Sequence, residues 1–126
     1  MASTKWVTKV RVEAGPSDNF FMAKGYHYVY PGEDPAKAPP VEDIKVKSVI
    51  TRPLEGAALP RGRLRVQGFA WAGEAGLGQV EVSSDGGAHW RPARLVGESQ
   101  PLAWREWAAE IEAPKPGRLT ILARAT

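Results

Sequence analysis

The chain has 126 residues, of which 43% are hydrophobic and 25% charged, as in an ordinary globular domain rather than a disordered chain. The 17 basic and 14 acidic residues are mixed along the sequence and leave a net charge of only +3, which argues against a nucleic-acid partner. No apolar run is long enough to cross a bilayer, so no membrane partner is expected, and the absence of cysteine excludes disulfides, thiolate metal sites and thiol nucleophiles.

The N-terminal segment has the pattern of a strand. Residues 1–12, MASTKWVTKVRV, lack the apolar core of a secretory signal, so they leave the cellular location undetermined. Alternation in residues 5–13 predicts a strand with one dry face. That face would carry Trp6, Thr8, Val10 and Val12.

Residues 14–40 form a segment that we call the aromatic arm. No regular period is present, and aromatic residues are spaced among Gly and Pro. This composition predicts an irregular segment that packs aromatic anchors onto another surface and ends in a Pro-rich linker. The aromatic residues are Phe20, Phe21, Tyr26, Tyr28 and Tyr30.

The remainder of the chain predicts an all-β sandwich. Short segments that mostly alternate between apolar and polar residues are separated by turn signals, at the spacing expected of such folds. The predicted strands are residues 45–51, 63–73, 78–85, 89–96, 103–113 and 118–126.

Residues 103–113, AWREWAAEIEA, fit two structures. Trp104, Trp107 and Ile111 have the spacing of one face of an amphipathic helix. The neighbouring strands and the PKPG turn that follows favour a strand instead.

Residues 79–90, QVEVSSDGGAHW, predict a hairpin. Asp85, Gly86 and Gly87 tolerate the positive φ values that a tight connection requires. Val80 and Val82 are expected to face Trp90 on the returning strand, as a cross-strand pair in the core.

The same hairpin contains the residue types of a catalytic triad. Ser83, Ser84 and Asp85 lie close to His89 in the sequence. Consecutive turn residues cannot hold nucleophile, base and orienting group in a convergent geometry, so we predict no catalytic role for them.

Other chemical motifs are weak. His27 and His89 are the only histidines and have no second ligand at metal spacing, so no metal site is predicted. The glycine-rich residues 72–78 lack the Lys-Ser/Thr and the helix start of a phosphate-binding loop, which favours a hairpin or edge loop. We therefore predict no catalytic residue in this chain.

The five tryptophans leave two interpretations open. An exposed Trp face would make the chain an immunoglobulin-like binding module for carbohydrate or peptide. Alternatively, four of them lie in the sandwich core and on its flank: Trp71, Trp90, Trp104 and Trp107.

Four segments in order resemble the C-terminal domain of sulfite oxidase-type molybdenum enzymes. They are VKSVITRP (46–53), VQGFAWAGEAGLGQVEVSSDGGAHWRPARL (66–95), WREW (104–107) and LTILARAT (119–126). In that family G-x-A-W-[AS]-G, V-E-V-S-x-D-G-G-x-[TH]-W and W-R-x-W follow one another. The resemblance implies that residues 41–126 are an immunoglobulin-like dimerisation domain of the E-set type, truncated at its C-terminus.

The resemblance continues upstream of this domain. Residues 1–12 look like the family's segment where the chain leaves the molybdopterin-binding domain. Residues 1–40 would then be a remnant of that junction plus a linker, and the chain a fragment or the product of an internal start. Lys5 matches a lysine near the pterin, which implies a cofactor-domain contact, the alternative being an exposed strand lysine.

The resemblance also sets the functional expectation. The family's molybdenum is held by a cysteine of the upstream domain, so this chain is expected to bind no cofactor and to be non-catalytic alone, with the molybdenum-molybdopterin in a parent enzyme. Expected partners are a second copy and the parent's molybdopterin domain, and the parent is compatible with a periplasmic location. Arg105 is a candidate for pairing with a carboxylate across a domain or partner interface, the alternative being an exposed salt bridge on a strand. The chain ends at Thr126, before a substrate-contacting arginine of animal members, which implies an exposed sheet edge.

Overall fold

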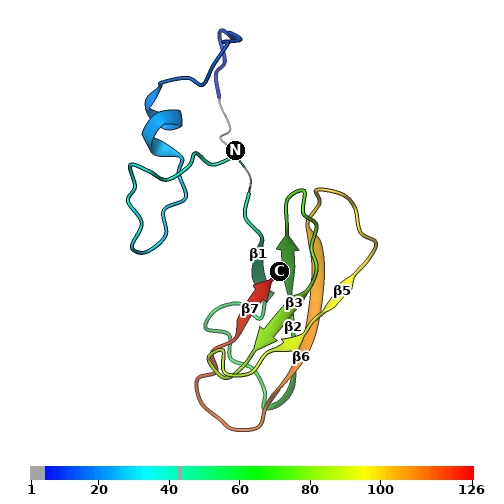
Figure 1. The fold of residues 1–126 in the computed structure, drawn as a ribbon. Helices are drawn as coiled ribbons and strands as arrows, with labels where there is room; N and C mark the ends of the chain where they lie inside the picture. Colours follow the sequence, from blue (N-terminus) through cyan, green and yellow to red (C-terminus); the bar gives the residue numbers. More distant parts are fainter. Residues whose placement is uncertain (1–4, 43) are drawn as a thin grey trace. The chain divides into compact units, whose positions relative to one another are not determined.

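The computed structural model describes residues 5–42 and 44–126. The chain divides into two compact units, the first ending at Ile44 and the second spanning Lys45–Thr126 (Figure 1). No helix in the described part of the chain is long and apolar enough to cross a membrane.

The strand predicted for residues 5–13 is wrong. These residues have no regular secondary structure, and Trp6 takes a left-handed φ of 58°. Trp6 and Val12 are each 95% exposed. Alternation produces a strand only where a neighbouring strand accepts its hydrogen bonds and another layer covers the apolar face. The described residues of the first unit supply neither.

The aromatic arm is irregular, as predicted, apart from one π-helical turn, η1, at Phe21–Gly25. Asn19 begins this turn because its Oδ1 accepts hydrogen bonds from the backbone N–H groups of Phe21 and Met22, at 3.0 and 3.2 Å. The rings of Phe20 and Phe21 meet edge to face at 5.6 Å, yet they stay 65% and 59% exposed. The packing of these rings onto another surface therefore stays a prediction.

The second unit confirms the predicted all-β sandwich. One layer is antiparallel, in the order β1 (Lys47–Arg52), β2 (Gly62–Trp71), β6 (Arg105–Ala113) and β5 (Arg94–Val96). The other layer has the order β4 (Arg91–Pro92), β3 (Val80–Ser83) and β7 (Leu122–Ala125), again antiparallel (Figure 1).

The ambiguous residues 103–113 form a strand, β6, as favoured. Strand β6 pairs with β2 along most of its length, from Gly62 opposite Ala113 to Ala70 opposite Arg105, and with β5 on its other side. A central position with hydrogen bonds on both sides outweighs the modest helix propensity of the segment.

The single strand predicted for residues 89–96 is instead two short strands in different layers. Strand β4 pairs with β3, and β5 pairs with β6. The chain crosses between the layers at Ala93, whose N–H still donates to the carbonyl of Val80 at 2.8 Å. Pro92 has no N–H to donate, so an unbroken ladder through this segment is not available.

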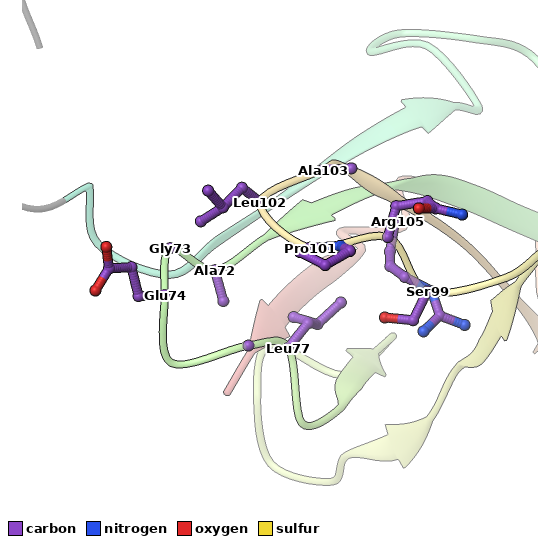
Figure 2. Close-up of a pocket in the computed structure, with 11 residues that line it drawn as sticks. Ala72, Gly73, Glu74, Leu77, Ser99, Pro101, Leu102, Ala103 and Arg105 are labelled. Carbon is purple, nitrogen blue, oxygen red and sulfur yellow. The ribbon is translucent and has the colours of Figure 1, made fainter.

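Two loops lie next to each other at one end of the sandwich and leave a hollow of about 290 Å³ between them. One loop connects β2 to β3 and the other connects β5 to β6. Figure 2 shows Leu77 on the first loop and Pro101 on the second, both beside the hollow.

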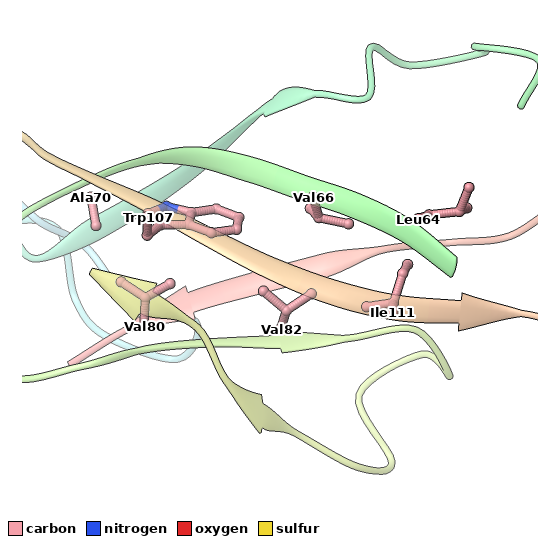
Figure 3. Close-up of a cluster of buried hydrophobic side chains, with 7 residues drawn as sticks. All are labelled: Leu64, Val66, Ala70, Val80, Val82, Trp107 and Ile111. Atoms are coloured by element: carbon pink, nitrogen blue, oxygen red, sulfur yellow. The ribbon is translucent and has the colours of Figure 1, made fainter. Parts of the chain in front are cut away.

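The core lies between the two layers. Alternate residues of β2 point inward and meet inward residues of β3 and β6 (Figure 3). Trp107 is fully buried and occupies the centre. The core cluster is Leu64, Val66, Ala70, Val80, Val82, Trp107 and Ile111.

Gly68 makes room for the central tryptophan. It pairs with Trp107 across β2 and β6. A Cβ atom at this position would lie 2.7 Å from Cζ2 of Trp107 and would also collide with the carbonyl oxygen of Val49. The glycine of the G-x-A-W motif is therefore required by packing, rather than by backbone flexibility.

The predicted pairing of Val80 and Val82 with Trp90 is wrong. Both valines belong to the core. The half-buried Trp90 lies instead under the Arg124 guanidinium, whose carbon is 4.2 Å from the ring centroid. Arg124 is opposite Glu81 in the ladder and bonds its Oε2 at 2.7 Å, so this group occupies the outer face of β3 and β7. The seven residues between β3 and β4 carry Trp90 around to that side.

Candidate functional site

The outer face of the four-stranded layer is apolar at one end and charged at the other. Directly paired residues of antiparallel strands point to the same face. The ladder therefore places Lys47 beside Trp71 in one row, and Val49, Phe69 and Glu106 side by side in the next row.

Apolar side chains gather at one end of this outer face, and we call this surface the apolar corner. Trp104 is 51% exposed, Val49 47% and Phe69 40%. Trp71 and the 64%-exposed Leu102 complete it. Exposed apolar clusters of this kind mark interaction surfaces more often than they occur by accident. The apolar corner consists of Val49, Phe69, Trp71, Leu102 and Trp104.

Local contacts hold the apolar corner in a defined shape. The rings of Trp71 and Trp104 stack with centroids 6.1 Å apart, and Nε1 of Trp71 donates to the carbonyl of Leu102 at 3.2 Å. Nζ of Lys47 lies 5.1 Å from the Trp104 centroid and 5.8 Å from that of Trp71. The cation–π contact covers part of two rings without neutralising the lysine charge.

The opposite end of the same face is charged and internally paired. Arg63 Nη1 lies 3.6 Å from an oxygen of Glu110, and its Nε lies 3.4 Å from an oxygen of Glu112. These side chains are largely exposed, so the pairs contribute little to stability. This end of the outer face is therefore hydrated.

Arg105 lies beside the hollow between the two loops (Figure 2). Its Nη2 donates to the carbonyl of Gly97 at 3.0 Å, whereas its buried Nε has no hydrogen-bond partner among the described residues. Within this chain it thus holds the β5–β6 loop. Its predicted pairing with a carboxylate across an interface stays a prediction.

Ser83, Asp85 and His89 do come together, but not as a catalytic triad. Asp85 lies between the other two: its Oδ1 accepts from the Ser83 hydroxyl at 2.8 Å, and its Oδ2 is 2.7 Å from Nδ1 of His89. A triad needs the histidine between nucleophile and carboxylate, and Ser83 is only 1% exposed. The three residues converge more closely than expected, and the absence of a catalytic role for them stays a prediction.

The three residues instead stabilise the β3–β4 loop. The backbone N–H of His89 and that of Gly87 donate to Asp85 Oδ1 and to Ser83 Oγ, at 3.0 and 2.9 Å. Gly86 and Gly87 take φ values of 74° and 94°, as predicted for this turn. The backbone N–H and the ring of His89 hold the pKa of Asp85 well below its usual range, with a further contribution from the Ser83 hydroxyl.

No group of three or more His, Cys, Asp or Glu side chains is placed to hold a metal ion among residues 5–42 and 44–126. His27 is used structurally, since its Nδ1 lies 2.6 Å from the carbonyl of Ala38. With no cysteine in the sequence, the donor set does not fit a thiolate-bound molybdenum.

Lys5 is exposed in the first unit, outside regular secondary structure. The expected strand that would have presented it is absent from the described residues. Its contact with a cofactor domain stays a prediction.

The four tryptophans of the second unit do not form a row on one face. Trp107 is in the core, Trp71 and Trp104 lie on the outer face of one layer, and Trp90 lies on the outer face of the other. This distribution agrees with the core-and-flank interpretation.

The apolar corner was missed at the sequence level although its signal was visible. In residues 64–71, Leu64 and Val66 face the core, and the residues that alternate with them face outward. The last two outward-facing residues are Phe69 and Trp71. An outward face that turns from Arg to aromatic residues along one strand indicates a partly covered surface.

Residues 38–126 match the family described as the Mo-co oxidoreductase dimerisation domain. Sulfite oxidase of Gallus gallus is 33% identical over 133 residues, which cover 98% of this chain and 29% of the relative. Mitochondrial sulfite oxidase of Mus musculus is 32% identical over 96% of this chain and 24% of the relative. The chain thus spans less than a third of the length of these relatives.

A solved structure has the same fold. The sulfane dehydrogenase SoxCD from Paracoccus pantotrophus superposes with a TM-score of 0.68 and 27% identity, over 85% of this chain and 27% of that one. The comparisons give no support to a carbohydrate- or peptide-binding module. The chain belongs to the Mo-co oxidoreductase dimerisation domain family, which confirms the resemblance identified from its motifs.

Proposed function

We propose that this chain is the dimerisation region of a sulfite oxidase-like molybdenum oxidoreductase and that its function is to join two copies of that enzyme. The match of residues 38–126 to a dimerisation domain family carries the proposal. Most oligomers of identical subunits are closed by a two-fold axis, which needs one self-complementary surface on each copy. The exposed apolar cluster on the outer face of the four-stranded layer is the surface that we propose for this contact.

The proposed domain division follows the family resemblance. Residues 41–126 are the immunoglobulin-like, E-set type dimerisation domain, and residues 1–40 belong to a junction with the molybdopterin domain. The exposure of Phe20 and Phe21 supports a role for the aromatic arm as a surface that packs on that domain. Lys5 is proposed to contact the cofactor domain from the same segment.

The molybdenum-molybdopterin is proposed to be bound by another part of the parent enzyme. This chain has no cysteine thiolate to offer, and its two histidines lie in hydrogen bonds to Ala38 and Asp85. Elemental analysis of the purified chain is expected to find no stoichiometric molybdenum. Molybdenum bound at one atom per chain would overturn this part of the proposal.

The oligomeric state tests the proposal as a whole. Sedimentation equilibrium of the chain is expected to show a reversible dimer, because the exposed apolar area is removed from water when two copies associate. A monomer that persists up to millimolar concentration would contradict the proposed function.

A further inference from the structure

We infer that two copies of the chain associate face to face through the apolar corner, with Lys47 of each copy opposite Glu106 of the other. The inference rests on the proposed dimerisation and assigns it to one surface. The occupant is a second copy of this chain, and four observations support that choice.

The first observation is exposure on a rigid support. Val49 and Phe69 lie side by side within the paired strands β1 and β2, where the backbone ladder fixes their positions. The stacking of Trp71 on Trp104 leaves Trp104 about half exposed. A preformed apolar surface loses little conformational entropy on association, which favours binding.

The second observation is that the other end of the face is unsuited to burial. The side chains of Arg63, Glu110 and Glu112 are already paired with one another and hydrated. Burying them would cost desolvation free energy without a new partner for their charges. Association is therefore directed to the apolar corner.

The third observation is that, within the second unit, the other exposed apolar side chains lie in several different elements. Leu54 lies in the β1–β2 connection and Leu119 in the β6–β7 connection. Leu122 is on the outer face of the other layer, near Gly87 of the loop that carries Trp90. Single exposed residues of this kind are normal on a protein surface.

The fourth observation is charge complementarity. Lys47 on β1 and Glu106 on β6 flank the aromatic residues of β2, one on each side. Neither makes an ion pair with a residue that the structure describes. The two charges of opposite sign thus border the same apolar surface.

A two-fold axis that lies in the interface, perpendicular to the line from Lys47 to Glu106 and through its midpoint, brings these charges together. The row of Lys47 and the row of Glu106 differ by two residues along the strand, about 7 Å, so this axis is oblique to β2. Rotation about it turns the face over and places Lys47 of one copy opposite Glu106 of the other. The two β2 strands then cross, so the charged ends that contain Arg63 do not face each other. The symmetry generates the contact twice, once at each side of the apolar centre.

The first test replaces the centre of the surface. Phe69→Glu is expected to weaken dimerisation about a hundredfold or more, because two carboxylates are then forced into the buried centre. Leu119→Glu is the matched control, since Leu119 is 38% exposed and Phe69 is 40%. The control is expected to dimerise like the unmodified chain in sedimentation equilibrium.

The second test reverses the bordering charges. Lys47→Glu alone and Glu106→Lys alone each place two like-charged pairs in the interface and are expected to raise the dimer Kd about tenfold or more. The double variant restores opposite charges and is expected to recover most of the affinity. Both side chains lie on the outer face, Lys47 exposed and Glu106 half-buried, so these variants remain informative should Phe69→Glu fail to fold.

The outcomes separate the inference from the proposed function. If the unmodified chain dimerises, and both Phe69→Glu and the single charge reversals dimerise equally well, the surface assignment is wrong while dimerisation stands. If the unmodified chain is a monomer, the proposed function itself fails. Loss of affinity in both single variants without recovery in the double variant would overturn the Lys47–Glu106 pairing.

Discussion

Single residues decide how closely the strands of this sandwich approach. Gly68 has no side chain because Trp107 fills the space above it. Asp85 accepts hydrogen bonds from Ser83 and from both the backbone and the ring of His89, and thereby ties the β3–β4 loop together. Gly68 thus serves packing, and Asp85, whose neighbours include the residue types of a triad, serves loop geometry.

Gly68→Ala is expected to reduce the free energy of unfolding by about 1–3 kcal/mol, because the added methyl group forces Trp107 or the β1 backbone to move. Chemical denaturation measures this change. Gly15→Ala is the control, since a Cβ there meets nothing within 4 Å, and its effect should stay within about 0.5 kcal/mol. Equal stability of the two variants would contradict the packing role of Gly68.

Asp85→Asn is expected to change the pH dependence of stability. The folded-state pKa of Asp85 lies below its unfolded value of about 4. Its contribution is therefore complete above about pH 4 and is lost as the pH falls through the folded-state pKa. The variant should be less stable than the unmodified chain near pH 7, and the difference should shrink towards about pH 2. Parallel pH profiles in urea denaturation would refute this role.

At the scale of elements, the context of a segment decides whether its pattern forms a strand. Residues 5–13 and β3 both alternate, but only β3 has β4 and β7 on either side and β2 and β6 across the core. Residues 103–113 show the reverse case, in which helix-compatible spacing is overridden by pairing with β2 and β5.

The same substitution at two valines tests this distinction. Val82→Ala removes methyl groups from a side chain that is 2% exposed and is expected to cost about 2 kcal/mol in free energy of unfolding. Val12→Ala affects a side chain that is 95% exposed, and should change stability by less than about 0.5 kcal/mol. Thermal denaturation of both variants provides the comparison. A cost at Val12 as large as that at Val82 would indicate a buried strand at residues 5–13.

At the scale of the whole molecule, each layer buries one face in the core. The two outer faces differ in how far their aromatic side chains are covered. One outer face has the Arg124–Trp90 contact and the Glu81–Arg124 ion pair, so its aromatic ring is covered from within the chain. The other has the apolar corner, where Trp104, Val49 and Phe69 stay 51%, 47% and 40% exposed. The asymmetry points to association through the second face.

Association of two copies predicts a melting temperature that depends on protein concentration. Only the folded chain dimerises, so a higher concentration favours the folded state by mass action. The Tm of the unmodified chain should rise across about a hundredfold increase in concentration, whereas the Tm of Phe69→Glu should stay constant. Differential scanning fluorimetry at several concentrations checks this, and a constant Tm in both proteins would contradict dimerisation.

The order of motifs by itself determined the family and the sandwich fold. Local pattern was enough for β2 and β3, because their alternating residues match the two faces of a layer, and for the Asp85-Gly86-Gly87 turn, which depends on φ at particular residues.

Only the tertiary structure decided which alternating segment pairs, where Trp90 lies and which outer face is left uncovered. Residues 5–13 do not form the predicted strand, Trp90 lies on the side away from Val80 and Val82, and the apolar corner combines side chains from β1, β2 and the β5–β6 loop. These features depend on contacts between residues far apart in the chain, and neighbouring residues do not encode the presence or position of such partners.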